Sequence, residues 1–374
     1  TISGPYGCAG PYSSWSASFP WVSCSAWSNG LNALQNKHFI ITAHPHQGCA
    51  FFLNTPMSIG VLVVTVWLTL VELNCENLFD YEHDPGKNDT EWVEGGVRRW
   101  SPQRYWLKQR HIAQEIMSCS NDTASWGLPN LIALTEVEND RVLHDLTRRS
   151  LLRNAGYHYL MTESADSRGI DVALLYQPLV FRPLCYDCLT VEPMEGMRPT
   201  RDILYVKGKY ISGDTLHVFV VHAPSKLSGA RSSQLWRQSV LQRITTEATR
   251  IQVQSPTAKI IITGDFNDVA DSPVLTALEA HGYHNVSKGV KGRHSVAKAS
   301  YRYLGHWQGI DHIFVSPSLL PHLEYCHIND APFLLEPDKK YGGHKPFRTY
   351  NGYRFQNGFS DHLPLVVRFQ FQRH

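Results

Sequence analysis

Hydrophobic residues recur along the chain with two spacings, which predict strands and helices. Every second residue from Leu216 to Val220 is apolar, as in a half-buried strand over residues 215–221. A Ser-Gly-Asp turn joins this strand to one expected over residues 203–211, which predicts a hairpin. Over residues 236–251 the apolar positions stand three or four apart, which predicts a long amphipathic helix.

Shorter apolar runs predict the remaining elements. Strands are expected at residues 66–73, 130–134, 157–161, 171–176, 260–263, 310–315 and 363–371, and helices at 106–117, 142–152 and 273–280. Strands that alternate with helices imply a layered α/β architecture, with sheets inside and helices outside.

Polar side chains stand at the ends of several of these predicted strands. The tetrad Gly264-Asp265-Phe266-Asn267 directly follows an apolar run. Other polar residues that adjoin apolar runs are Asn74, Glu136 and His222 before the tetrad, and Asp311, Asp361 and His362 after it. Because a single sheet can present all of them at one edge, the pattern predicts an acidic, histidine-flanked metal site.

Six short motifs in this order resemble the endonuclease/exonuclease/phosphatase superfamily of metal-dependent phosphoesterases. The superfamily includes abasic-site endonucleases, deoxyribonuclease I, sphingomyelinases and inositol-phosphate phosphatases. The resemblance covers roughly residues 65–374, and the stretches 301–307 and 341–360 resemble a bacterial branch in particular. It implies an α/β fold that is a four-layer α/β/β/α sandwich with two packed mixed sheets.

A phosphoesterase site of this kind needs a divalent ion, and hard oxygen ligands suit Mg²⁺, with Mn²⁺ as an alternative. Glu136 is the principal ligand that we expect, although a solvated loop acid would have the same local sequence. By resemblance, Asn74 is an active-site asparagine that ligates the metal region or hydrogen-bonds the phosphate; a strand-end turn is the alternative. Asp361 is expected to serve the metal or its solvent network.

The catalytic residues are expected to act on water and phosphate. Asp265 would accept a proton from the attacking water or orient it, and Asn267 would hold the water or a phosphate oxygen. By resemblance, His362 contacts the phosphate and Asp311 orients a catalytic histidine. His222 resembles a position that carries a histidine general acid in some members and a tyrosine in others.

Four further residues are expected to bind substrate. Ser225 sits where several members place an asparagine or serine near the phosphate. Arg168 and Arg201 can bind a phosphate through two hydrogen bonds, although structural ion pairs are an equal alternative. Trp307 follows a basic aromatic stretch and predicts a rim for a base or sugar, with core packing as the other interpretation.

Composition adds few constraints. The chain has 374 residues, of which 18% are charged and 43% hydrophobic, and its net charge of +2 gives no extended footprint for nucleic acid. Eight cysteines without paired zinc spacing are expected to be free thiols, which favours a reducing, cytoplasmic location. The apolar run at residues 59–71 is shorter than a membrane-spanning helix, so no membrane span is expected. We expect a monomer.

Residues 1–56 differ from the rest, because Lys37 is their only Lys, Arg, Asp or Glu. We interpret this stretch as an unmatched, non-native or disordered segment before a domain over residues 57–374; a genuine interaction segment is the alternative. Because all motifs and all predicted strands lie after Met57, no strand is expected before it, and deletion of residues 1–56 is expected to leave activity and thermal stability nearly unchanged.

The sequence therefore predicts a Mg²⁺-dependent phosphoric ester hydrolase, with nucleic acid as the expected substrate and an endonuclease or exonuclease activity. Hydrolysis of a small phosphate ester or lipid head group is the second hypothesis. A catalytically silent binding module is the third, and the simultaneous presence of the acids, asparagines and histidines above argues against it.

Overall fold

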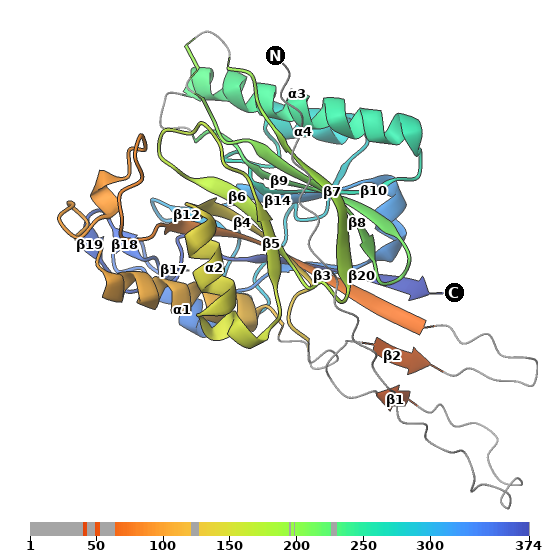
Figure 1. Ribbon diagram of the computed structural model, residues 1–374, viewed down its shortest axis with the longest axis horizontal. Coiled ribbons are helices and arrows are strands. Elements are labelled where there is room, and N and C mark those ends of the chain that lie inside the picture. The colour runs from red at the N-terminus through yellow and green to blue at the C-terminus, as the bar shows by residue number, and fades with distance from the viewer. Residues whose placement is uncertain are drawn as a thin grey trace, which may run out of the picture. The chain divides into compact units, whose positions relative to one another are not determined.

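The computed structural model describes residues 40–42, 49–52, 64–120, 127–193, 196–197, 199–225 and 230–373. Within these residues the chain forms two mixed β-sheets that pack face to face, with helices on their outer sides (Figure 1).

The strands divide between the sheets as follows. The first sheet has the order β5 (His158–Met161), β6 (Asp171–Tyr176), β4 (Leu131–Val137), β3 (Val64–Leu78), β20 (Leu365–Arg373) and β15 (Leu323–Ile328), and β2 (Cys49–Phe52) and β1 (Ile40–Thr42) extend it from the beginning of β3. The second sheet has the order β11 (His284–Asn285), β14 (Asp311–Val315), β10 (Lys259–Asp265), β9 (Thr215–His222), β8 (Ile203–Tyr210) and β7 (Phe181–Leu189).

In the described part of the chain, four α-helices cover the outer faces, two on each sheet. The helices are α1 (Pro102–Ser118) and α2 (Asp140–Arg148) on the first sheet, and α3 (Ala230–Gln254) and α4 (Pro273–Ala280) on the second. Short 3₁₀ helices are η1 (Thr90–Trp92), η2 (Leu151–Asn154), η4 (Pro317–His322) and η5 (Pro332–Leu334). Three small hairpins complete the described fold: β12 (Tyr301–Tyr303) with β13 (His306–Gln308), β16 (Leu335–Pro337) with β17 (His344–Pro346), and β18 (Tyr350–Asn351) with β19 (Arg354–Phe355).

Alternation along the strands separates three hydrophobic cores. Leu216, Val218 and Val220 of β9 face the core between the sheets, as their period of two predicts, whereas Phe219 and Val221 face α3 and α4. Along the strands of the first sheet, buried residues likewise face either the core between the sheets or the core against α1 and α2. The layers are therefore helix, sheet, sheet, helix, which confirms the expected α/β/β/α sandwich.

Strand directions bring the ends of several strands to one edge of the sandwich. β3 runs parallel to β4, and β9 runs parallel to β10, so the carboxyl ends of each pair lie together. β14 is antiparallel to β10 and pairs Asp311 with Asp265, so its amino end lies at the same edge. β20 is antiparallel to β3 and begins opposite Glu72, which brings the residues before Leu365 beside the end of β3.

Most predicted elements agree with the structure, and the differences have local causes. The helix expected over residues 142–152 ends at Arg148, because Ser150 instead accepts a hydrogen bond from the amide of Leu152 and starts η2. The strands β7 and β15 were not predicted. β1 and β2 lie before residue 57, so the expectation of no strand there was wrong: β2 pairs with β3.

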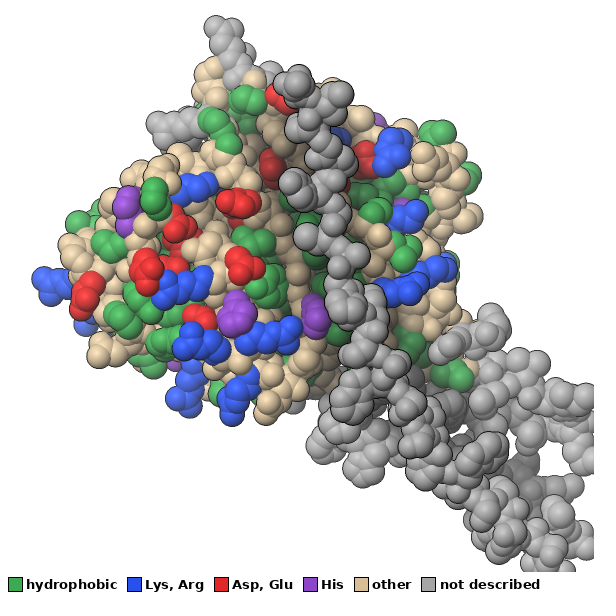
Figure 2. Space-filling view, viewed as in Figure 1, with side chains coloured by type: hydrophobic (Ala, Val, Ile, Leu, Met, Phe, Trp, Pro, Cys, Tyr) green, Lys and Arg blue, Asp and Glu red, His purple; other side chains and the backbone are tan. Residues whose placement is uncertain are grey.

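The remaining sequence-based expectations concern cysteines, membranes and charge. Within the described residues, Cys75, Cys119, Cys185, Cys188 and Cys326 are free thiols, as expected. No helix in that part of the chain is long and apolar enough to span a membrane. Figure 2 shows acidic and basic side chains mixed on the visible face, without a continuous basic band.

Candidate active site

A bulge in β4 turns Glu136 toward the edge where the strands end. Leu131 and Ala133 face the core between the sheets, and the pairing with β6 shifts between Thr135 and Val137. Glu136 lies within this shift and has a φ of 59°, which is uncommon for residues other than glycine and asparagine. Val137 consequently packs on the outer core, and Glu136 is left at the strand end.

A second bulge in β3 lies beside the first. The pairing of β3 with β4 shifts between Asn74 and Leu78, and both Glu76 and Asn77 have positive φ values, 49° and 59°. The amide of Asn77 donates a hydrogen bond to Oε2 of Glu136 at 2.9 Å, which ties the two bulges together. Strained backbone that is fixed in this way is common at functional sites.

Asp265 ends β10 at the centre of the candidate site. Nδ2 of Asn74 donates to its Oδ2 at 3.0 Å, and the amide of Asn267 donates to its Oδ1 at 2.8 Å. Nδ2 of Asn267 also lies 3.2 Å from Oδ2. Burial, together with the nearby Asp311 carboxylate, raises the pKa of Asp265 to about 7.

Gly264 makes this arrangement sterically feasible. Its φ is 141°, and a Cβ atom placed on it would stand 1.9 Å from the carbonyl oxygen of Val221. The close approach lets β10 continue beside β9, where Asp265 pairs with His222. This glycine requirement explains the first position of the tetrad.

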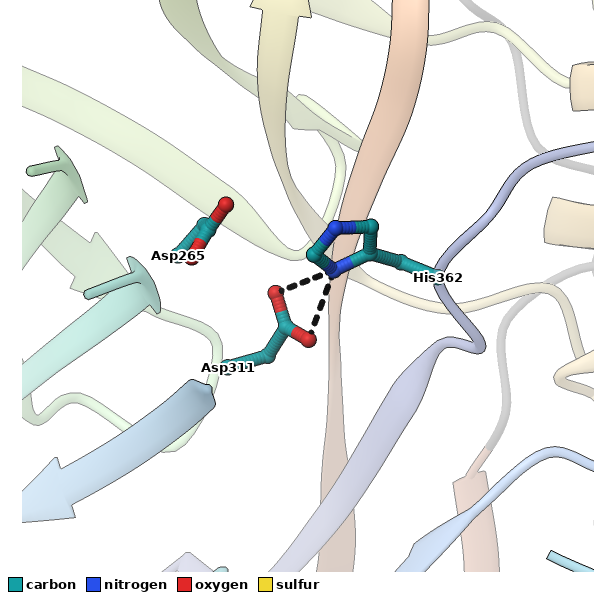
Figure 3. Close-up of side chains that lie close together, drawn as sticks. All are labelled: Asp265, Asp311 and His362. Atoms are coloured by element: carbon teal, nitrogen blue, oxygen red, sulfur yellow. Dashed lines mark hydrogen bonds and ion pairs between the residues drawn. The ribbon is translucent and has the colours of Figure 1, made fainter. Parts of the chain in front are cut away.

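Asp311 and His362 form a hydrogen-bonded pair (Figure 3). Nδ1 of His362 lies 2.8 Å from Oδ2 and 3.0 Å from Oδ1 of Asp311, and the hydroxyl of Ser300 donates to the same carboxylate at 2.5 Å. Burial alone would lower the pKa of His362, but the charges of Asp311, Asp361 and Asp265 raise it well above its usual range. These charges favour the imidazolium form of His362, whose Nε2–H is turned from its partner carboxylate.

His222 ends β9 and is the second buried histidine of the site. Its Nε2 lies 3.7 Å from Oδ2 of Asp265 and 3.8 Å from Oε1 of Glu136. Burial lowers its pKa well below the usual range, and Arg201 and Arg168 add to that effect. Its Nδ1 has no hydrogen-bond partner among the described residues. His222 is therefore neutral in this environment.

The two arginines expected to bind substrate lie in different surroundings. Arg168 is half exposed, donates to Oδ1 of Asn77 at 2.6 Å, and lies 3.9 Å from Oε1 of Glu136. Arg201 is buried and makes an ion pair with Asp166 at 2.9 Å. Arg168 thus faces the site. Arg201 instead forms a structural ion pair, which was the alternative interpretation of the sequence.

The other two expected substrate residues lie at the same end of the molecule. Ser225 is half-buried and follows β9 three residues after His222. Trp307 of β13 lines a cavity of about 260 Å³ that Ser300 and Asp311 also line, and the guanidinium of Arg302 lies over its ring at 5.6 Å. This cavity borders the Asp311–His362 pair, so Trp307 lies at the rim of the candidate site. Trp307 also packs against the core between the sheets, as the other interpretation expected.

Asp361 has two neighbours in the site. Its Oδ2 accepts a hydrogen bond from Nη2 of Arg348 at 2.7 Å, and its Oδ1 lies 4.0 Å from Nε2 of His362. Arg348 also contacts Oε1 of Glu76 at 3.4 Å. Sequence reasoning missed Glu76 and Arg348; the position of Glu76 two residues after Asn74 was the one available signal.

Tyr301 was expected only as part of the aromatic stretch 301–307, and Glu72 was missed. The ring of Tyr301 stacks at a tilt on His362, with centroids 4.8 Å apart, and the two residues form a backbone bridge. Glu72 is fully buried on β3, and its carboxyl oxygens have no partner among the described residues. Burial and the charges of Asp311 and Asp265 raise the pKa of Glu72 well above its usual range. Glu72 lies two residues before Asn74 on the same strand, so the two side chains point to the same face. This spacing was the signal for Glu72 in the sequence.

The ligand atoms fit a hard divalent ion. One ligand atom each from Asp265, Asp311 and His362 lie within 4.8 Å of one another, but the protonated form of His362 offers no lone pair to a metal. Nε2 of His222 lies 3.8 Å from Oε1 of Glu136, and Nη2 of Arg168 lies 3.9 Å from it. Neither distance is that of a hydrogen bond, so this oxygen remains available to a metal ion. Burial, together with the nearby Asp311 carboxylate, raises the pKa of Asp265, and a cation bound nearby would stabilise its charged form.

The expectation that one sheet carries the whole site was wrong. The first sheet supplies Asn74 and Glu136, whereas the second supplies His222, Asp265 and Asp311. His362 comes from the segment before β20. The site therefore lies across the seam between the two sheets.

Sequence comparison identifies the family. Residues 69–371 match the profile of the Endonuclease/Exonuclease/phosphatase family. The chain belongs to this family. As a member of the endonuclease/exonuclease/phosphatase family, it is a phosphoesterase whose substrate the family does not define. No curated protein matches the chain.

Solved structures of the family share the fold. An endonuclease/exonuclease/phosphatase family protein from Bacteroides thetaiotaomicron is 16% identical, with a TM-score of 0.54 over 82% of this chain and 98% of that one. A mannosyl-6-phosphatase from the same organism is 16% identical, with a TM-score of 0.54 over 81% and 99%. Truncated TDP2 of Caenorhabditis elegans is 14% identical, with a TM-score of 0.50 over 81% and 97%. At these identities the likeness concerns the fold alone.

Proposed function

We propose that this family member hydrolyses phosphodiesters with the help of Mg²⁺ and that nucleic acid is its substrate. The observation that carries the reaction class is Asp265, a buried carboxyl with a pKa of about 7, held by two carboxamides beside two histidines. A base with a pKa near the working pH is efficient in general base catalysis.

Asp265 is the proposed proton acceptor. Asn74 and Asn267 donate hydrogen bonds to the carboxylate and fix its orientation, so an attacking water at the mouth of the site can transfer its proton to it. Holding the carboxylate in advance avoids reorganisation during the reaction.

His362 is the proposed donor to a non-bridging phosphate oxygen. Asp311 accepts the hydrogen bond from Nδ1, which leaves Nε2–H as the group that reaches outward. As negative charge accumulates on the phosphate, this charged donor stabilises the transition state more than the ground state.

His222 is the proposed contact for the leaving oxygen. It is expected to act as a neutral hydrogen-bond donor through Nε2, because its lowered pKa disfavours the charged acid form. Arg168, beside Glu136, is expected to contact a second phosphate oxygen.

Glu136 and Asn74 are the residues that would hold the divalent ion. Such an ion offsets charge on the phosphate and on the leaving oxygen. Asp361 would serve the metal or its solvent network from its position beside His362. Its Oδ2 already accepts a hydrogen bond from Arg348.

The cavity beside Asp311 favours a substrate with more than one phosphate. Trp307 offers an aromatic surface there, and Lys288 and Lys298 line the same cavity. A base on the indole and a neighbouring phosphate near a lysine would use these features. A small phosphate ester is the second candidate, because a mannosyl-6-phosphatase has the same fold and the net charge of this chain is only +2.

A substrate panel tests both candidates. Single-stranded DNA, duplex DNA with an abasic site, RNA, mannose 6-phosphate, inositol phosphates and sphingomyelin are each incubated with Mg²⁺ or with EDTA. We expect Mg²⁺-dependent cleavage of a nucleic acid. Faster release of phosphate from a small ester would favour the second candidate, and no turnover with any ester would reject the proposed reaction.

A further inference from the structure

Arg348 bridges the buried Glu76 and the half-buried Asp361 at the edge of the candidate site. Its Nη2 donates to Oδ2 of Asp361 at 2.7 Å, and its Nε donates to Oε1 of Glu76 at 3.4 Å. Glu76 and Asp361 lie 285 positions apart in the sequence, at the end of β3 and in the segment before β20. Arg348 therefore joins two chain segments that both border the reacting groups.

The guanidinium keeps donors that these two contacts do not use. An arginine has five N–H groups in a planar fork, and the bonds to Glu76 and Asp361 account for two of them. Among the described residues, no other group accepts a hydrogen bond from the Arg348 guanidinium. The side chain is 34% exposed, so part of it can be reached from solvent.

The backbone around Arg348 is held in place from several sides. Glu76 accepts hydrogen bonds from the amides of Thr349 and Tyr350 at 2.6 and 3.2 Å. Nζ of the buried Lys108 donates to Oγ1 of Thr349 at 2.6 Å. Because the next residues are fixed, the guanidinium loses little conformational freedom when it binds a ligand.

A glycine closes the same loop from the other side. A Cβ atom on Gly358 would stand 2.3 Å from the carbonyl oxygen of Arg348, so the returning segment packs directly on this backbone. Lys108 also donates to the carbonyl oxygen of Phe359 at 2.5 Å. The loop is thus anchored at both ends to one lysine of α1.

The position of Arg348 places it beside the proposed phosphate contact. Asp361 directly precedes His362, and Oδ1 of Asp361 is 4.0 Å from Nε2 of His362. The outward N–H of His362 and the free donors of Arg348 therefore flank the same carboxylate. Two cationic donors on one side of a site suit a phosphoryl group, which carries several acceptor oxygens.

We propose that Arg348 is a phosphate-binding residue, a fixed cation that contacts a phosphoryl oxygen of the substrate while it bridges Glu76 and Asp361. The inference rests on the proposed function, which supplies the phosphoryl group as ligand. A purely structural ion pair would hold the loop without contacting any ligand. Binding of inorganic phosphate separates the two roles.

The test compares Arg348→Ala and Arg348→Lys with the wild type, and Arg110→Ala serves as the matched control. Arg110 is an exposed arginine of α1, so its removal changes the net charge equally without touching the site. Titration calorimetry with inorganic phosphate in Mg²⁺ buffer gives the dissociation constant, and thermal unfolding checks each fold.

We expect Arg348→Ala to weaken phosphate binding by about tenfold or more, and Arg348→Lys to weaken it less, because a lysine keeps the charge and loses the fork geometry. If Arg348→Ala does not fold, Arg348→Lys alone decides by its phosphate affinity. Unchanged affinity in the folded variants, or an equal loss in Arg110→Ala, would overturn the proposal.

Failure of the proposed reaction would look different. A wild-type protein that binds phosphate through Arg348 but hydrolyses none of the esters would reject the hydrolase and retain the binding residue. If the wild type hydrolyses an ester and Arg348→Ala keeps the wild-type phosphate affinity and KM, the hydrolase is retained and the binding role of Arg348 is rejected.

Discussion

The protonation states of individual residues follow from the partners that each buried group contacts. Asp265 and His362 lie in one cluster, and burial opposes charge on both. The hydrogen bond to Asp311 maintains the charge on His362, whereas Asp265 has only neutral donors and titrates near pH 7. One cluster therefore holds a charged donor and a base of moderate strength, the combination that hydrolysis by water requires.

At this scale, Glu136→Gln tests the metal ligand. The substitution removes one charge and keeps the shape, and Oε1 of Gln still accepts the hydrogen bond that Asn77 donates to Glu136. We expect Mg²⁺ affinity and turnover to fall, turnover by about a hundredfold or more, with the thermal unfolding temperature nearly unchanged. Calorimetry with Mg²⁺ and a hydrolysis assay measure the two effects; wild-type values for both would remove Glu136 from the ligand role.

The Asp311–His362 pair predicts effects that do not add. His362→Ala should lower kcat by about a hundredfold to ten-thousandfold, as expected for loss of an acid–base or hydrogen-bonding group in the transition state. Asp311→Asn should lower kcat as well, because an amide no longer favours the required proton on Nδ1. The double variant should be no slower than the slower single variant. Changes confined to KM, or fully multiplicative losses, would contradict this coupling.

Local sequence signals predicted whole elements well and irregular positions poorly. The strand over residues 171–176 and the helix over residues 273–280 agree with β6 and α4, because their patterns depend on neighbouring residues alone. The bulges at Glu76 and Glu136 depend on how each strand pairs with another, which one segment does not contain. β7 and β15 lacked a clear pattern because most of their residues are exposed or half-exposed, including apolar ones such as Leu184 and Tyr186.

Helix α1 carries a buried acid whose ionisation should control stability. Burial raises the pKa of Glu115 from its ordinary value of 4.5 to about 8, and its carboxyl oxygens have no partner among the described residues. Between these two pH values the folded protein binds more protons than the unfolded chain does. The free energy of unfolding should therefore fall as the pH rises through this window, by at most about 1.4 kcal/mol per pH unit from this group.

Glu115→Gln should flatten that pH dependence. Urea unfolding of the wild type and the variant at pH 5 and pH 8, both in EDTA, gives the comparison. The variant should lose less stability between the two pH values, because Gln does not ionise, whereas Glu94→Gln at an exposed site should behave as the wild type does. Parallel curves for all three proteins would show that Glu115 does not titrate in this range.

Across the whole molecule, the sequence located the strand-end residues of the site together with Asp361 and His362, and missed the residue that the segment before β18 delivers. Asn74, Asp265 and Asp311 were found because each adjoins an apolar run, and the fold brings them together at one edge. Arg348 contacts Glu76 from 272 positions away. No local pattern contains such a contact, which depends on the packing of the loop between β17 and β20 against the end of β3.

The choice between nucleic acid and a small ester concerns the whole molecule, because it depends on how many phosphates the surface contacts. A nucleic acid should bind with an affinity that falls steeply with salt, since each neutralised phosphate releases counterions. Lys298 lines the cavity beside Trp307, so Lys298→Ala should reduce the slope of log affinity against log salt by about 1. Lys291→Ala, in the same loop but outside the cavity lining, should leave the slope nearly unchanged.

Removal of the aromatic surface provides the complementary measurement. Trp307→Ala should cost about 1–3 kcal/mol in oligonucleotide binding if a base stacks there, and it should affect a phosphate monoester without a base much less. The comparison is needed because Trp307 also packs against the core and carries Arg302 over its ring, so a general loss of structure would slow both substrates alike. Affinity for oligonucleotides that is insensitive to salt, combined with equal losses on both substrates in Trp307→Ala, would exclude a base-binding role for this cavity and leave the small ester as the better substrate.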